Sequence, residues 1–359
     1  MRIINTHAHW YPQQWVDLLE KEGGNNGAVI GKNARGEVTF NKPGTQFRGF
    51  EDKPVKANIV FRRDQIDIEM RLRKMDETRV DVQVLSLTTP MVYWAPPEFG
   101  LELSQVFNDA CSAIHLKHPD RFLAMAMAPM QAPELAVREI ERASRLPGIR
   151  GLYLATHING RNLDDKAFFP VYARCEELNW PIFLHPGNPV GGDRTSKYFL
   201  VNLLGNPYDT GIAAACLMFG GVLDAFPKLD VMLPHAGGAF PALIGRMDHG
   251  ATMRPEIRHM TRPPSDYLRR FHYDTIAHNS RFLMYMVREI GADRIVLGDD
   301  YPADMGYKRP VDVIDELTGL TASEREMILG SNAERLLRLE PLAARETRTV
   351  QYRPAVAGA

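Results

Sequence analysis

The first residues of the chain place two histidines one residue apart. The apolar pair Ile3 and Ile4 leads into a short predicted β-strand that ends at His7 and His9. Residues i and i+2 of a strand project from the same face, so the two imidazoles are expected side by side at the strand's C-terminal end. Two neutral imidazoles on one rigid edge suit a divalent metal such as zinc. Taken alone, the pair is equally compatible with two ordinary polar residues near a chain terminus.

Other side chains able to bind a metal or move a proton also follow apolar, strand-like runs. They are His185, His235, Asp274 and the adjacent Asp299 and Asp300. A single histidine at a strand end is more often a hydrogen-bonded structural residue, and two aspartates before Tyr301-Pro302 would also suit a turn. If the strands share one rim, however, the imidazoles and a carboxylate converge. Such a group predicts a divalent-metal site with an open position for water, as catalytic zinc centres require.

The elements that must position these residues form a regular alternation. Eight predicted strands, each followed by helical sequence, occupy residues 3–9, 80–87, 122–127, 149–154, 181–185, 231–235, 271–274 and 294–298. Long helices are predicted for residues 206–226 and 322–337, among others. The pattern predicts a single (β/α)₈ TIM barrel over residues 1–340. Residues 23–58 are predicted to form an insertion over the mouth of the site, and residues 341–359 a tail. A doubly wound open sheet is the alternative, but polar residues end many strands rather than lying at one switch point.

Composition excludes several classes of function. The 359 residues include 43 basic and 44 acidic side chains, a net charge of −1 without the footprint expected for nucleic-acid or membrane binding. No apolar run approaches the roughly 18 residues of a spanning helix. No signal peptide is expected either, because the first residues are predicted to form a strand rather than a basic segment followed by an apolar one. The three cysteines are far apart in the sequence, which indicates buried free thiols and a cytoplasmic protein. The expected partner is therefore a small molecule.

Several motifs resemble one known superfamily. His7-Ala-His9, Leu184-His185-Pro186, Pro-His-Ala-Gly-Gly at 234–238 and Leu-Gly-Asp-Asp-Tyr-Pro at 297–302 resemble the amidohydrolase superfamily. More closely, they are similar to its branch of 2-amino-3-carboxymuconate-6-semialdehyde decarboxylase and related aromatic-acid decarboxylases. Residues 74–84, 262–267 and 330–335 also match the branch. The resemblance runs in order from about Ile3 to Leu339 with few gaps.

The resemblance implies a role for each residue of the centre. The implied ligands of Zn²⁺, or of another divalent ion such as Mn²⁺, are His7, His9, His185 and Asp300. Asp300, directly before Tyr301-Pro302, is a better match than Asp299. His235 matches the histidine that positions and deprotonates the metal-bound water, so His235 and Asp300 are the implied catalytic residues.

Two arginines are implied to bind the substrate carboxylate, and three residues are candidates for them. Arg246 matches an arginine that reaches into the neighbouring subunit's site, which implies a homodimer. A second arginine is expected from the loop before the helix that contains Lys74. Arg62 is the preferred match and Arg48 the rival. For each of them, a solvated surface charge is the competing interpretation.

Two departures concern the substrate. The branch pattern has tryptophan where this chain has Gly187, and phenylalanine where it has Ala303. Both changes remove aromatic bulk from the expected pocket, so a larger or differently shaped acid is expected. The leading hypothesis is a metal-dependent, non-oxidative decarboxylase of an unsaturated or aromatic carboxylic acid that needs no organic cofactor. The alternatives are a hydrolase or hydratase acting on a lactone, amide or dicarboxylate, and a barrel retained as a binding or regulatory protein.

Overall fold

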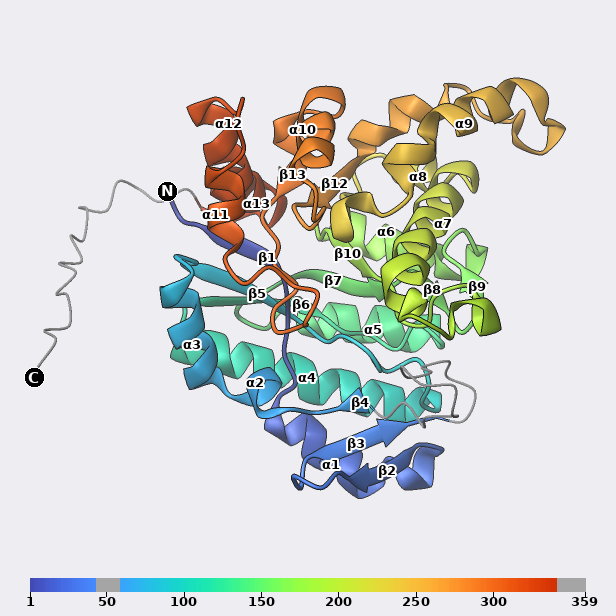
Figure 1. The fold of residues 1–359 in the computed structure, drawn as a ribbon. Coiled ribbons are helices and arrows are strands. Elements are labelled where there is room, and N and C mark those ends of the chain that lie inside the picture. The colour runs from blue at the N-terminus through green and yellow to red at the C-terminus, as the bar shows by residue number, and fades with distance from the viewer. Residues whose placement is uncertain (43–58, 341–359) are drawn as a thin grey trace, which may run out of the picture.

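The computed structural model describes residues 1–42 and 59–340, and its centre is a parallel eight-stranded barrel (Figure 1). The strands follow one another around the barrel in sequence order. They are β1 (Ile4–His9), β5 (Val82–Ser86), β6 (Phe122–Ala126), β7 (Ile149–Ala155), β10 (Ile182–His185), β11 (Val231–Leu233), β12 (Phe271–Asp274) and β13 (Ile295–Val296). The predicted TIM barrel is confirmed.

The barrel closes between its first and last strands. The Thr6 amide donates to the Leu297 carbonyl at 2.8 Å, and the His9 amide to the Tyr301 carbonyl at 2.7 Å. Every residue of β6, Phe-Leu-Ala-Met-Ala, is buried, because side chains fill the barrel on one face of the strand and helices cover the other. The closing hydrogen bonds involve the segments that contain His7, His9 and Asp300, so closure also brings these residues together.

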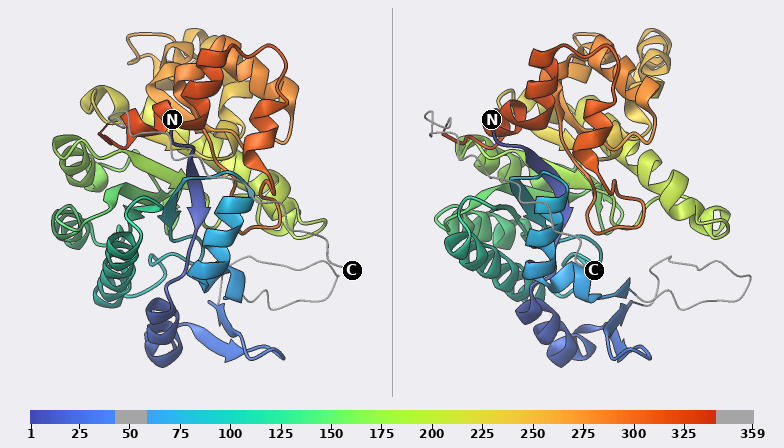
Figure 2. Two further views of the ribbon diagram at one scale, coloured as in Figure 1. Left: turned by 90° about the vertical axis from the view of Figure 1, so that its left-hand side faces the viewer. Right: turned by 60° about the vertical axis from the view of Figure 1, so that its left-hand side comes forward.

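Helices surround the barrel (Figures 1 and 2). In α5, Leu135, Ala136, Ile140 and Ala143 form the buried apolar face at helical spacing. The long outer helices are α1 (Gln13–Glu22), α3 (Ile68–Glu77), α4 (Pro97–Lys117), α5 (Pro133–Ala143), α6 (Phe169–Glu177), α7 (Asn206–Phe219), α9 (Phe240–Met253) and α10 (Ser280–Glu289). The shorter helices are α2 (Arg63–Ile66), α8 (Val222–Ala225), α11 (Pro310–Asp315), α12 (Ala322–Glu326) and α13 (Asn332–Leu336).

Two predicted helices differ in detail from the structure. The single helix expected over residues 206–226 is wrong, because α7 ends at Phe219 and Gly221 adopts a left-handed conformation with φ 73° before α8. Glycine permits that turn without a steric penalty. The helix expected over 322–337 is interrupted by a π-helical segment, Met327–Ser331, between α12 and α13.

A small antiparallel sheet lies beside α1, on the opposite side of the molecule from α9 and α10 in Figure 1. Its strands are β2 (Val29–Lys32), β3 (Val38–Asn41) and β4 (Ile59–Val60). Phe61, which follows β4, packs its ring 4.8 Å from that of Tyr11. Residues 43–58 of the predicted insertion and the predicted tail 341–359 lie outside the described residues. A second small sheet pairs β8 (His157–Ile158) with β9 (Arg161–Asn162).

The remaining sequence expectations concern the cysteines and the membrane. Cys111 and Cys175 are buried free thiols, as predicted, whereas the free thiol Cys216 is only half-buried. Among the described residues, no helix combines the length and apolar character needed to cross a bilayer.

Candidate active site

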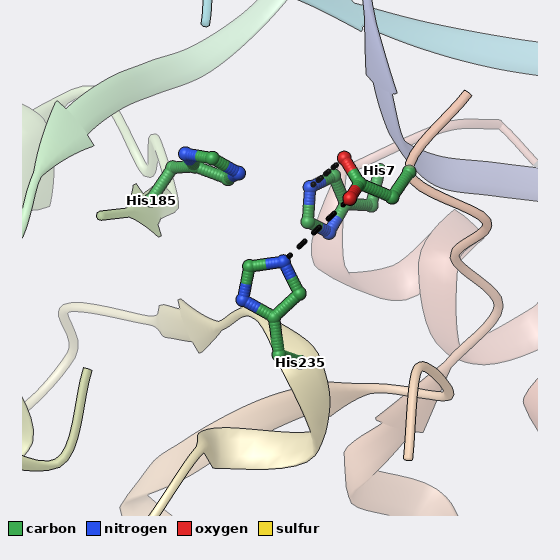
Figure 3. A group of neighbouring side chains, drawn as sticks. His7, His185 and His235 are labelled. Atoms are coloured by element: carbon green, nitrogen blue, oxygen red, sulfur yellow. Dashed lines mark ion pairs between the residues drawn. The ribbon is translucent and has the colours of Figure 1, made fainter. Parts of the chain in front are cut away.

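Five side chains meet at the C-terminal rim of the barrel. One ligand atom from each of His7, His185, His235 and Asp300 lies within 4.8 Å of the others. His9 completes the group, because its Nε2 is 3.2 Å from Nε2 of His7 and 2.8 Å from Oδ1 of Asp300. In Figure 3 the rings of His7, His185 and His235 are close to one another, although they come from different parts of the barrel. The structure thus brings together the five residues that the sequence singled out.

Hydrogen bonds at Nδ1 fix the direction in which two of the imidazoles point. Nδ1 of His7 donates to Oδ2 of the buried Asp274 at 2.6 Å. Nδ1 of His185 donates to the Pro186 carbonyl at 2.9 Å. A neutral imidazole that donates through Nδ1 keeps its lone pair on Nε2. Both rings therefore offer Nε2 as a possible metal ligand.

Ser86 orients the third imidazole, that of His9. The Ser86 hydroxyl donates to the Ala8 carbonyl at 3.0 Å, so it accepts from Nδ1 of His9, also at 3.0 Å. Nε2 of His9 is then the unprotonated nitrogen and faces His7 and Asp300. Such outer partners orient metal ligands in known sites.

Asp274 is the functional residue whose role sequence reasoning missed. Besides His7, its carboxylate accepts the amide hydrogens of His235 at 2.9 Å, Ala236 at 2.8 Å and Ile276 at 3.0 Å. It therefore holds both His7 and the turn that presents His235. The only sequence signal was its position at the end of the seventh strand.

The ionisable groups of the centre strongly perturb one another. Burial alone would lower the pKa of His7, but hydrogen bonds to Asp274 and Asp300 raise it to about 10. Burial lowers the pKa of His9 to about 4, and burial with the neighbouring imidazoles holds the pKa of His185 well below its usual value. Burial opposes ionisation of Asp300, yet hydrogen bonds from His235 and His7 hold its pKa well below the usual range. Of His7, His9 and His185, it is therefore His7 that carries an additional proton.

The donor atoms fit a divalent metal. Nε2 of His185 is buried and has no hydrogen-bond partner among the described residues, which is unusual for a buried polar atom. Several imidazole nitrogens and one carboxylate form a donor set that suits zinc and neighbouring transition metals. The group can therefore hold a divalent ion.

His9 and His235 differ in position, and this distinguishes their roles. His9 is 3% exposed and held by Ser86. His235 has a 17% exposed side chain, its Nε2 lies 3.8 Å from Oδ2 of Asp300, and it follows β11 on a turn with φ 52°. The rigid, buried imidazole suits a ligand, whereas the more accessible one suits contact with a substrate.

The centre opens into a cavity of about 600 Å³. His9, His185, His235 and Asp300 line it together with Arg62, and both departures from the branch pattern also line it, namely Gly187 and Ala303. A Cβ atom on Gly187 would come no closer than 3.7 Å to its neighbours. The missing aromatic bulk therefore corresponds to space beside the centre.

The three predicted arginines have different positions. Arg62 lines the cavity, donates from Nη2 to the Pro302 carbonyl at 3.0 Å and pairs with Asp64 at 3.1 Å. Arg246 is exposed on α9 and is not among the described residues that line the cavity of its own chain. Arg48 lies outside the described residues.

Other sequence candidates have structural roles. Oδ1 of Asp299 accepts the Tyr301 amide at 2.8 Å, which makes it the turn residue and leaves Asp300 as the group at the centre. His157 hydrogen-bonds to the Asn188 carbonyl at 2.7 Å, and His272 lies 3.4 Å from Asp230. Within the described part of the chain, neither histidine lines the cavity.

A closed (β/α)₈ barrel with a histidine and carboxylate centre at its C-terminal rim defines the class of TIM-barrel proteins built to hold a catalytic metal. The amidohydrolase family model matches residues 4–339. The chain belongs to the amidohydrolase family, in the branch that contains 2-amino-3-carboxymuconate-6-semialdehyde decarboxylase.

Known proteins of this branch match most of the chain. The 2-amino-3-carboxymuconate-6-semialdehyde decarboxylase of Dictyostelium discoideum is 33% identical over 342 residues, 94% of this chain and 92% of that protein. The crystal structure of 5-carboxyvanillate decarboxylase from Sphingomonas paucimobilis has a TM-score of 0.78 at 26% identity, covering 94% of this chain and 99% of that one. Dihydroxybenzoic acid decarboxylase from Polaromonas sp. JS666, solved with bound manganese and the inhibitor 2-nitroresorcinol, has a TM-score of 0.74 at 25% identity, covering 94% and 97%.

Replacement of Asp274 by asparagine tests its role in orienting His7. Asp274→Asn should weaken divalent-metal binding about 10- to 100-fold, because the amide no longer stabilises the His7 tautomer that offers Nε2. Competition with a chromophoric chelator measures the affinity. Asp230→Asn is the matched control, since Asp230 also pairs with a histidine but outside the cavity. Equal metal affinity in Asp274→Asn and wild type would contradict the assignment.

The proton on His7 predicts a pH dependence of metal binding. Because the pKa of His7 is raised to about 10, the ring is protonated at pH 7, and an ion that takes Nε2 must displace this proton. Binding at pH 7 should therefore release roughly one proton, and affinity should rise as pH increases toward 10. Calorimetry in buffers of different ionisation enthalpy measures the release. Binding without proton release at pH 7 would contradict the charge state.

Proposed function

We propose that this chain is a metal-dependent, non-oxidative decarboxylase of an unsaturated or aromatic carboxylic acid. The observation that carries the proposal is the convergence of three fixed Nε2 atoms and Asp300 at one end of a cavity that also contains His235 and Arg62. The similarity to decarboxylases over more than nine-tenths of the chain supports the same reaction type.

His7, His9, His185 and Asp300 would hold the ion, which we propose to be zinc. When bound, a divalent ion acts as a Lewis acid toward an oxygen of the substrate. The zinc assignment rests on the imidazole-rich donor set. Manganese, which the Polaromonas enzyme holds, is the alternative. Metal analysis of the purified protein distinguishes the two ions.

The side chains of this chain then divide the remaining tasks. Arg62 has a planar guanidinium that suits a carboxylate, and its contacts with Asp64 and Pro302 keep it at the cavity wall. His235, on the accessible side of the centre, delivers a proton to the carbon that bears the carboxylate. The π electrons of the unsaturated substrate form the new C–H bond, the bond from that carbon to the carboxyl group then breaks, its electron pair restores the π system, and CO₂ leaves. Asp300 stays ionised under its hydrogen bonds, which leaves His235 as the proton donor.

Arg246 contributes to this function only if a second chain is present. It projects from α9 outside the cavity of its own chain, and Leu243, one turn earlier, is 39% exposed. Neighbouring α7 and the segment before it add the exposed side chains of Leu203, Leu204, Tyr208 and Ile212. An apolar surface of this kind is typical of a protein interface. We therefore propose a homodimer in which Arg246 enters the partner's site and binds substrate carboxylate.

The cellular location is also a proposal. Three free cysteines suit a reducing compartment. We propose that the protein is cytoplasmic.

A panel of hydroxybenzoic, carboxyvanillic and unsaturated dicarboxylic acids, with lactones and amides beside them, tests the reaction. At least one acid should release CO₂ and change its ultraviolet spectrum. His235→Asn should keep the metal and lose about 10²- to 10⁴-fold in kcat, the usual contribution of a positioned acid. His249→Asn, an exposed histidine on α9, is the control. Turnover of lactones or amides without CO₂ release would favour the hydrolase alternative, and a near-normal rate for His235→Asn would remove its role.

Subunit mixing tests the shared site. Arg246→Ala and His235→Asn should each be inactive, because one lacks the partner's arginine and the other its own proton donor. After exchange, mixed dimers contain one intact site, so activity should return to about a quarter of the wild-type value at equal mixing. Arg254→Ala, an exposed arginine just after α9, should be active without mixing. No recovery despite demonstrated subunit exchange would argue against the arrangement.

A further inference from the structure

A fully buried arginine lies directly behind the centre. Arg71, on α3, is 0% exposed. Its Nη1 donates to Oε1 of Gln83 at 2.7 Å, its Nη2 donates to the carbonyl of His9, and its guanidinium lies 4.7 Å from the centre of the Tyr301 ring. One side chain thus contacts the end of β1, the middle of β5 and the segment after β13.

This burial is costly and calls for an explanation. Removing a guanidinium from water is unfavourable unless its charge and its donors are satisfied. Among the described residues, Arg71 forms no ion pair within 4.0 Å, and its Nε has no hydrogen-bond partner. Asp299 and Asp64 attract its charge from further away. A hydrophobic residue would fill the same space without this cost, so the contacts of the guanidinium themselves are the reason for its presence.

Two of the three contacted residues belong to the proposed metal centre or lie next to it in the sequence. Arg71 donates a hydrogen bond to the backbone carbonyl of His9, a proposed metal ligand. Tyr301 directly follows Asp300, and its carbonyl accepts the His9 amide at 2.7 Å. Arg71 therefore contacts both partners of the hydrogen bond that joins the end of β1 to the segment after β13, namely His9 and Tyr301.

We propose that Arg71 is a positioning residue that sets the separation of His9 and Asp300 by bonding the His9 carbonyl while stacking on the Tyr301 ring. The inference rests on the proposed metal centre. Its physical basis is the shape of guanidinium, whose planar fork donates along its edge while its face covers an aromatic ring. A lysine ammonium keeps the charge but has no planar face and no fork, so it cannot make these contacts together.

Cobalt(II) binding to the purified full-length chain tests the proposal without a known substrate. Arg71→Met, of similar length but neutral, should raise the Kd for Co²⁺ about 10- to 100-fold, as loss of an outer partner of a metal ligand does. It should also change the visible absorption bands, which report the ligand geometry. Arg71→Lys should give an intermediate loss. Arg73→Met is the matched control, because Arg73 lies on the same helix and is exposed.

The outcomes separate positioning from a purely structural role. A folded Arg71→Met chain with wild-type Kd and spectrum would overturn the proposal, even if its unfolding midpoint falls. If Arg71→Met does not fold, Co²⁺ binding is measured for Arg71→Lys and Gln83→Leu instead. Weaker binding supports the proposal, and unchanged binding in both variants overturns it. Failure of the wild-type chain to bind Co²⁺ would overturn the metal centre itself, a result distinct from an unaffected Arg71→Met.

Discussion

The arrangement of the centre depends on one buried carboxylate. Asp274 accepts the Nδ1 hydrogen of His7 and the amide hydrogens of His235, Ala236 and Ile276. One group thus orients a metal ligand and also the backbone of the proposed proton donor. Burial penalises an ionised carboxylate, yet the hydrogen bond and charge of His7, together with His235 and the Ala236 amide, hold the pKa of Asp274 below its usual value. Asp274 therefore couples the proposed ligand His7 to the proposed proton donor His235, so that a displacement of one side chain alters the position of the other.

These hydrogen bonds also explain how the site tolerates an unfavourable backbone. His235, Ala236 and Asp300 have φ values of 52°, 54° and 59°, in the left-handed region that side chains with a Cβ rarely adopt. Each such residue costs on the order of 1–3 kcal/mol. The Asp274 carboxylate stabilises the first two, while the Asp300 amide donates to the His7 carbonyl at 2.9 Å. The strain aims His235 and Asp300 at the same point, which an extended continuation of β11 and β13 would not do.

Sequence reasoning predicted those parts of the molecule that depend on local patterns. Apolar runs ending in His7, His9, His185 and Asp274 gave the strands and hence the barrel, because buried parallel strands are almost continuously apolar. The centre followed from the rule that strand ends share one rim. The roles of Asp274 and Arg71 were missed because both depend on contacts between distant segments that the closed barrel brings together, and such contacts leave no mark in residue spacing. The break at Gly221 was missed for another reason, since an isolated glycine inside an apolar helical pattern is compatible with either outcome.

Different residues of the cavity determine the reaction and the choice of substrate, which explains why membership of the family indicates the reaction more firmly than the substrate. The proposed metal ligands lie on strands, or in Asp300 just after one, and the barrel's own hydrogen bonds tie these segments together. Gly187 and Ala303 lie after the strands, where the loss of an aromatic ring leaves the ligand geometry intact and enlarges the space beside it. Arg62, Arg35 and Glu37 add charge to the same wall from the segments around β2, β3 and α2. We therefore propose that the cavity favours an acid with more bulk or further polar groups than a simple benzoate, because the same cavity contains both the centre and this charged wall.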